Sequence, residues 1–137
     1  MVRPTASGRH EFWYEDDMFG VRFRGPITRR DLEALRMAVD AVADEHPRSY
    51  LLTDMKECTG IEAEARKYMA VWSKEPDRGL VGTAVYGNGF MMRSLITLAL
   101  QAIRLLGQRE ALIHFFKEEA EARRWVAAHR ASAAAAP

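Results

Sequence analysis

Residues 18–42 read MFGVRFRGPITRRDLEALRMAVDAV, and this stretch decides the fold. Its first part, Met18 to Arg24, alternates between large apolar residues and small or charged ones, which predicts a half-buried strand. Thr28 and Asp31 then have the spacing of a capping box, which predicts the start of a helix. We expect the helix to bury one apolar stripe, made by Leu32, Leu35, Val39 and Val42.

The segments on either side extend this strand–helix unit. Upstream, residues 10–14 predict a second strand, and the acidic residues 15–17 predict the turn of a hairpin. Downstream, strands expected at 49–55, 80–86 and 111–116 alternate with helices expected from residue 59 to about 76, after Gly89 to about 106, and at 118–130. This order predicts an α/β fold with a mixed, mostly parallel sheet of about five strands, an N-terminal β-hairpin and about four helices. We expect Phe115 and Trp125 in its core.

The predicted helix after residue 58 carries a second capping signal. Thr59 and Glu62 repeat the spacing of Thr28 and Asp31, so we expect Thr59 to cap this helix. The inner face of the helix would then carry Ile61, Ala65, Tyr68, Met69 and Trp72.

Length and composition indicate one domain. The chain has 137 residues and a formal net charge of +1, which gives no general attraction to nucleic acid. We expect a disordered N-terminus at residues 1–8, a folded domain at 9–130 and an alanine-rich tail at 131–137. With Cys58 as the single cysteine, no internal disulfide can form, which favours a reducing compartment and a cytoplasmic location. No apolar run is long enough for a transmembrane segment.

The residue types that enzymes use do not form a recognisable constellation. The serines lie in no nucleophile motif, and the histidines are scattered, His114 being expected as a partly buried side chain. Cys58 precedes a predicted helix and is interpreted as a small half-buried residue rather than a reactive thiolate. We therefore expect no enzyme activity, no metal and no cofactor. The loop at Asn88 and Gly89 opens a helix, so its amides could hold an anion, although a plain turn is the simpler interpretation.

The predicted helix from about Met91 to Leu106 has an unusually narrow polar side. Its polar residues form a single strip, made by Arg93, Thr97, Gln101 and Arg104. Apolar residues cover the rest: Met91, Met92, Leu95, Ile96, Leu98, Leu100, Ile103, Leu105 and Leu106. Large exposed apolar patches mark interaction sites, so we expect a homodimer contact here, with Asn88 beside it. The alternatives are an apolar or lipid ligand, peripheral membrane contact, and cover by the chain's own last helix and the loop after Tyr86.

Three segments together resemble the SpoIIAA-like family of STAS-type domains. They are residues 24–32, residues 51–66 with the strings LLTD, TGI and EAR, and residues 114–125 with the string HFFKEEAEARRW. The resemblance implies a STAS-like fold and a non-enzymatic regulatory module that binds proteins, or alternatively a module that binds a small apolar or lipid ligand. Classical members carry a phosphorylated Ser or Thr in a D-S-x-G-like motif. Thr59 is the nearest match, but Cys58-Thr59-Gly60 departs from that motif, which weakens the case for phosphorylation.

Overall fold

The computed structural model describes residues 5–7, 9–73, 80–87 and 113–135. Within these ranges six strands form one sheet, in the order β1-β2-β3-β4-β5-β6. The strands are β1 (Thr5–Ser7), β2 (His10–Glu15), β3 (Met18–Ile27), β4 (Ser49–Ile61), β5 (Leu80–Tyr86) and β6 (Ile113–Phe116). The described helices are α1 (Arg29–Glu45), α2 (Ala63–Ser73) and α4 (Glu119–Ala135).

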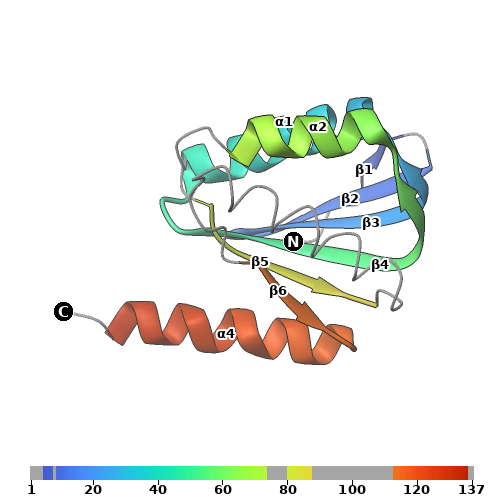
Figure 1. Cartoon of the computed structure of the whole chain (residues 1–137). Coiled ribbons are helices and arrows are strands. Elements are labelled where there is room, and N and C mark those ends of the chain that lie inside the picture. Colours follow the sequence, from blue (N-terminus) through green and yellow to red (C-terminus); the bar gives the residue numbers. More distant parts are fainter. Residues whose placement is uncertain (1–4, 8, 74–79, 88–112, 136–137) are drawn as a thin grey trace.

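The sheet is mixed and the helices lie on both of its faces. β1 and β3 pair antiparallel with β2, whereas β3, β4, β5 and β6 run parallel to one another. α1 and α2 lie side by side on one face, and α4 lies on the other (Figure 1). The predicted α/β class, the hairpin and the parallel strands are confirmed.

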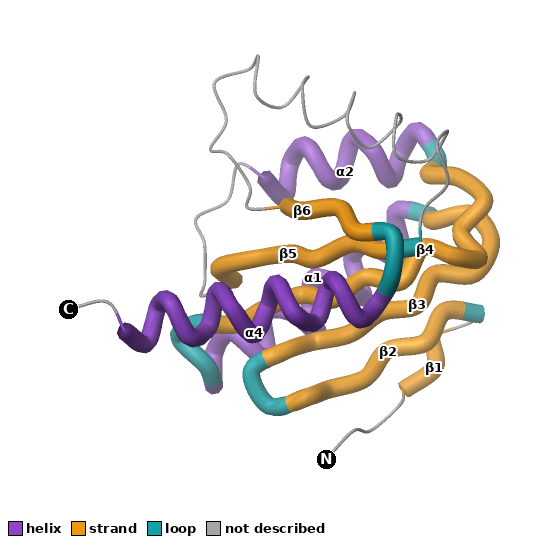
Figure 2. The backbone as a smooth tube through the Cα atoms, turned by 90° about the horizontal axis from the view of Figure 1, so that it is seen from below, coloured by secondary structure: helices purple, strands orange, loops and turns teal. Residues whose placement is uncertain are grey.

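Both ends of the described chain depart from the sequence expectation. Thr5–Ser7, inside the segment expected to be disordered, pair with β2 and add a sixth strand at the sheet edge (Figure 2). At the other end, α4 continues to Ala135 because alanine is the residue that helices favour most, so most of the alanine-rich tail is helix. The predicted helix at 91–106 lies outside the described residues, and three helices are described where about four were expected.

The start of α1 follows the predicted capping box. The Thr28 hydroxyl accepts a hydrogen bond from the Asp31 backbone N–H at 3.2 Å, and the Asp31 carboxylate accepts one from the Thr28 N–H at 2.9 Å. The predicted stripe of α1 is buried, and Ile27, just before the cap, is buried as well. Two of the orphan donors at the helix N-terminus are thereby satisfied.

The predicted cap at Thr59 is wrong. β4 does not end near Met55 but continues to Ile61, and α2 begins only at Ala63. The reason is the length of β3, whose last residues pair with the end of β4, from Gly25 beside Cys58 to Ile27 beside Ile61. Thr59 is therefore an exposed strand residue, because the pairing with β3 overrides a local helix signal.

The sheet separates two apolar cores. The core beneath α1 and α2 includes Phe12, Phe19, Val21, Phe23, Leu32, Leu35, Leu51, Met55 and Val85. The core beneath α4 includes Trp13, Met18, Tyr50, Leu52, Ala84, Ala122 and Val126. The alternation along β3 explains the division, since Phe19, Val21 and Phe23 face α1 while Met18 faces α4.

Phe115 and Trp125 pack against these cores but are only half-buried. The Trp125 ring lies 4.5 Å from the ring of His114 and 5.3 Å from that of His129, between centroids. A fully buried tryptophan would cost about 3–5 kcal/mol on truncation. For the half-buried Trp125 we expect Trp125→Ala to lower the free energy of unfolding by about 2 kcal/mol, measured by urea denaturation. A loss above 4 kcal/mol, or none, would contradict this environment.

Candidate functional site

A row of polar side chains crosses four strands on the face of the sheet that carries α4. Glu11 in β2 pairs with Arg22 in β3, Arg22 pairs with Asp54 in β4, and Asp54 pairs with Tyr86 in β5. We call these four residues the polar row. Because side chains alternate between the two faces of a sheet, residues paired in register point to the same side.

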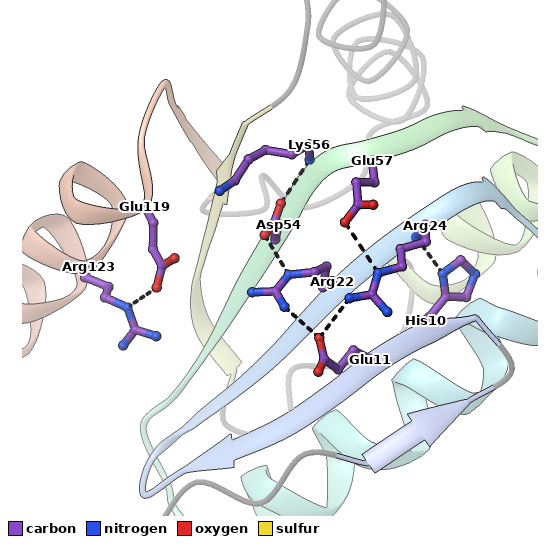
Figure 3. Close-up of polar contacts among 9 residues, drawn as sticks. All are labelled: His10, Glu11, Arg22, Arg24, Asp54, Lys56, Glu57, Glu119 and Arg123. Carbon is purple, nitrogen blue, oxygen red and sulfur yellow. Dashed lines mark hydrogen bonds and ion pairs between the residues drawn. The ribbon is translucent and has the colours of Figure 1, made fainter.

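The polar row begins where the apolar layer beneath α4 ends. Two positions away along the strands, the same face carries the apolar or small residues Trp13, Gly20, Leu52 and Ala84, which pair in register in the same way. In β3 and β4, charged Arg22 and Asp54 follow buried Gly20 and Leu52 after two positions on the same face. The sheet thus places the polar row directly beside a packed core. Figure 3 shows three of its members, Glu11, Arg22 and Asp54.

Asp54 organises the polar row. Its carboxylate is only 2% exposed. One oxygen accepts a hydrogen bond from Arg22 Nε at 3.0 Å, and the other accepts one from the Lys56 backbone N–H at 2.9 Å. Arg22 also donates to Glu11 at 2.7 Å, and its hydrogen bond to Asp54 raises the pKa of the guanidinium further. A buried carboxylate is tolerated when it is paired and hydrogen-bonded in this way.

Two exposed side chains continue the ion pairs beyond the polar row. Arg24 Nε lies 3.4 Å from Glu57, and Arg24 Nη2 lies 3.5 Å from Glu11. The side chain of Arg24 is 44% exposed and that of Glu57 is 60% exposed. Positive and negative groups therefore alternate from Glu57 through Arg24, Glu11 and Arg22 to Asp54 (Figure 3).

Tyr86 ends the polar row and differs from the other three residues. Its hydroxyl oxygen is buried and has no hydrogen-bond partner within the described part of the chain. Burial, and then the nearby carboxylates of Asp54 and Glu119, raise the pKa of the phenol, which stays protonated at neutral pH. The Lys56 ammonium lies 5.7 Å from the centre of the Tyr86 ring.

His10 and Asp31 form a pair that resembles a catalytic dyad but has a structural role. His10 Nδ1 accepts the backbone N–H of Arg24 at 3.0 Å, so the other nitrogen, Nε2, carries the hydrogen that it donates to Asp31 at 2.9 Å. Burial alone would raise the pKa of Asp31, but the hydrogen bonds from Thr28 and His10 outweigh it and lower that pKa. With both ring nitrogens engaged and the ring 1% exposed, His10 has no free nitrogen to act as a base.

Arginine–carboxylate pairs attach α4 to the hairpin turn. Arg123 donates to both oxygens of Glu15 at 2.8 Å, and Arg130 donates to both oxygens of Asp17 at 2.7 and 2.9 Å. A depression of about 480 Å³ lies between the turn and α4 and is lined by these four side chains with Asp16, Met18 and Val126. Bidentate pairs of this kind are the strong form of salt bridge, so they orient α4 on the sheet.

The pairing of Glu15 with Arg123 should make part of the stability depend on pH. The hydrogen bond from Arg123 lowers the pKa of Glu15 below its ordinary value of 4.5. A carboxyl group whose pKa is lower in the folded than in the unfolded protein stabilises the fold at pH values above its ordinary pKa. This stabilisation is lost as the pH falls through the pKa of the folded state. We therefore expect Glu15→Gln to be less stable than the wild type at neutral pH, and the difference to shrink below pH 4.5.

Thermal melts of both proteins across this pH range check the prediction. The control is Glu64→Gln, which removes an exposed carboxylate paired with Lys67 on α2 and should change stability little at any pH. A stability difference between Glu15→Gln and the wild type that stays constant down to acid pH would show that Glu15 does not act through its charge.

The predicted site residues have different outcomes. Thr59 is an exposed residue of β4, and its phosphorylation stays a prediction. Cys58 is half-buried, its thiol donates to the Gly60 carbonyl at 3.5 Å, and burial raises its pKa, which agrees with an unreactive thiol. The candidate interface residues Asn88, Met91, Met92, Arg93, Leu95, Leu98 and Arg104 lie outside the described residues.

Sequence reasoning missed the polar row. The sequence predicted no site role for Arg22, Arg24, Asp54 or Tyr86. The only signal was the alternation along β3. It places Arg22 and Arg24 on one face of the strand and Phe19, Val21 and Phe23 on the other. Their partners in β2, β4 and β5 depend on strand register, which a single sequence does not contain.

The described residues offer neither a metal centre nor a membrane-spanning helix. No group of three or more His, Cys, Asp and Glu side chains gathers there as metal ligands would. None of the helices in the described ranges is both long and apolar enough to span a bilayer.

The mixed sheet, with α1 and α2 on one face and α4 on the other, makes the described part of the chain an α/β domain (Figure 1). A sequence profile described as SpoIIAA-like matches residues 18–127, which is most of the chain. The chain therefore belongs to the SpoIIAA-like family. No curated protein sequence matches it.

Two solved structures share the fold. The first is an uncharacterized protein from Shewanella loihica PV-4 with a SpoIIAA-like fold, at 16% identity and a TM-score of 0.55, over 91% of each chain. The second is the anti-sigma factor antagonist SpoIIAA in its unphosphorylated form, at 10% identity and a TM-score of 0.54, over 92% of this chain and 97% of that chain. At these identities the likeness concerns the fold.

Proposed function

We propose that the chain is a non-enzymatic regulatory module that acts by binding another protein. Membership of the SpoIIAA-like family and the likeness to an anti-sigma factor antagonist support this class of function. The observation that carries the proposal is the run of alternating charges at Glu57, Arg24 and Glu11. Its exposed members, Glu57 and Arg24, continue the polar row over the face of the sheet. This surface is the proposed contact for the partner.

The geometry of these ion pairs suits an exchangeable contact. The distances from Arg24 to Glu57 and to Glu11 are 3.4 and 3.5 Å, and exposed pairs of this kind contribute at most about 1 kcal/mol. A partner that offers its own charges can therefore replace them at small cost. The buried Asp54 keeps Arg22 in place meanwhile, so the surface is preorganised. Complementary charge of this kind governs specificity and association rate.

A charge-reversal experiment tests the proposed surface. The wild type, Arg24→Glu and the control Lys67→Glu, on the exposed side of α2, are each expressed in the native host and crosslinked through lysines. We expect one protein to be linked specifically through Lys56 of the wild type, and its purified form to bind Arg24→Glu at least tenfold more weakly than the control. Equal binding to all three proteins, or crosslinks confined to Lys67 of α2, would contradict the proposal.

Self-association remains a proposal that rests on the sequence pattern of residues 91–106. The near-continuous apolar surface expected there favours a homodimer, and the same pattern favours the alternative function, binding of a small apolar or lipid ligand with peripheral membrane contact. Light scattering of the wild type should give the mass of a dimer, and Leu98→Glu should reduce it to that of a monomer. A wild type that stays monomeric at high concentration and does not bind liposomes would contradict both versions.

A further inference from the structure

The buried indole of Trp13 joins the polar row to the hairpin turn. The guanidinium carbon of Arg22 lies 5.7 Å from the centre of the Trp13 ring. The indole N–H donates to the Glu15 carboxylate at the turn, over 2.6 Å. The bare backbone of Gly20 gives the indole its place, since a Cβ atom at Gly20 would stand 2.0 Å from Trp13 Cε2. With 7% exposure, the ring is fixed by its packing.

A chain of contacts leads from this indole to α4. Arg123 donates to both oxygens of Glu15 at 2.8 Å, and one of these oxygens also accepts the indole N–H. Arg123 donates to Glu119 at 2.8 Å as well, which fixes the guanidinium on its own helix. Because the indole and Arg123 share one carboxylate, the position of the indole depends on the attachment of α4.

Arg22 carries this dependence to the proposed surface of Glu57, Arg24 and Glu11. Its guanidinium donates to Asp54 at 3.0 Å and to Glu11 at 2.7 Å (Figure 3). Glu11 is also the carboxylate that Arg24 approaches at 3.5 Å. Two carboxylates thus hold the guanidinium through hydrogen bonds, and the indole is the third group against which it rests. A binding residue keeps its geometry only when such neighbours fix its side chain.

We propose that Trp13 is a positioning residue of the proposed surface, and that Arg123 holds it in place from α4 through Glu15. Trp13 acts through Arg22 and does not touch the partner protein. The inference rests on the proposed function and adds a regulation to it: the attachment of α4 and the affinity for the partner are coupled. The coupling is reciprocal, so the bound partner strengthens the attachment of α4 by the same factor.

The coupling is measured without any partner, by NMR on the isotope-labelled full chain. The signals are the indole N–H of Trp13 and the Nε–H of Arg22, which exchanges slowly with water while it donates to the buried Asp54. We expect Arg123→Gln to shift both signals and to speed exchange of the Arg22 Nε–H about threefold or more.

Arg130→Gln is the matched control for a general loosening of α4. Arg130 also lies on α4 and pairs with both oxygens of a turn carboxylate, but this carboxylate is Asp17, and the ring under Arg130 is that of Tyr50. We expect Arg130→Gln to leave the Trp13 and Arg22 signals in place. Equal effects of the two variants, or an unchanged Arg22 signal in Arg123→Gln, would overturn the inference.

A double-mutant cycle tests whether the effect passes through the indole. Trp13→Phe keeps a ring for Arg22 but has no N–H for Glu15. Trp13→Phe alone should therefore speed exchange of the Arg22 Nε–H, and adding Arg123→Gln should have little further effect. An effect of Arg123→Gln that is as large in Trp13→Phe as in the wild type would show that Trp13 does not carry the coupling.

The partner identified by crosslinking gives the second readout. Arg123→Gln should weaken its binding about threefold or more, whereas Arg130→Gln should bind it as the wild type does. Equal affinities for the two variants would contradict the coupling. The two proposals fail separately: wild-type binding by Arg24→Glu overturns the proposed surface, whereas unchanged NMR signals in Arg123→Gln overturn the role of Trp13 alone.

Discussion

His10→Ala should lower the free energy of unfolding by about 4 kcal/mol. The substitution leaves the Arg24 N–H without its acceptor and the Asp31 carboxylate without one of its donors. It also removes a ring that packs edge-on against Phe23 at 5.1 Å between centroids. Because His10 is 2% exposed, water cannot readily replace these contacts.

Urea denaturation of His10→Ala beside His46→Ala checks this expectation. His46 ends α1 through its backbone N–H, which bonds to the Val42 carbonyl at 2.9 Å and is kept by alanine. We therefore expect His46→Ala to change stability by less than about 1 kcal/mol. A loss for His10→Ala as small as that of the control would mean that the His10–Asp31 pair does not join the hairpin to α1.

Gly20→Ala should lower the free energy of unfolding by about 3 kcal/mol, although it adds a single methyl group. Gly20 pairs with Trp13 across the hairpin, and the indole lies on the bare backbone of Gly20. A Cβ atom at this position would stand 2.0 Å from Trp13 Cε2. The indole would have to leave a site where its N–H donates to Glu15 at 2.6 Å and Arg22 lies over its ring.

The chain offers a matched control for this overpacking. Gly60 is also a strand glycine, but a Cβ atom there would have no neighbour within 4 Å. Gly60→Ala should therefore be neutral or slightly stabilising, since it reduces the freedom of the unfolded chain. Thermal melts of both variants with tryptophan fluorescence compare them directly. Equal melting temperatures for the two would refute the close packing of Trp13 on Gly20.

The two capping signals in the sequence differ in how well they predicted the start of a helix. The capping box at Thr28 and Asp31 predicted the start of α1 because its hydrogen bonds are local and its apolar stripe follows at once. The same pattern at Thr59 and Glu62 failed because β3 supplies backbone partners as far as Ile61. A local signal is reliable only where no strand competes for the same backbone groups.

The candidate site shows a different limit of prediction from the sequence. Glu11, Arg22, Asp54 and Tyr86 come from four strands whose order and register bring them together. A charged residue in a strand pattern looks like a solvated position until its cross-strand partners are known. The buried carboxylate of Asp54 could have been suspected only from its place after the apolar run at residues 50–52. Register is a tertiary property, and the polar row follows from it.

The attachment of α4 to the first hairpin has a consequence for how the chain folds during synthesis. Arg123 bonds to Glu15 across 108 residues, and Arg130 bonds to Asp17 across 113. The hairpin, α1, β4 and α2 can assemble as soon as residue 73 has left the ribosome. The side chains of Trp13, Met18 and others beneath α4 must wait for residues 119–135. A growing chain thus carries this apolar surface without its α4 cover until residues 119–135 have been made, the condition in which nascent chains aggregate or engage chaperones.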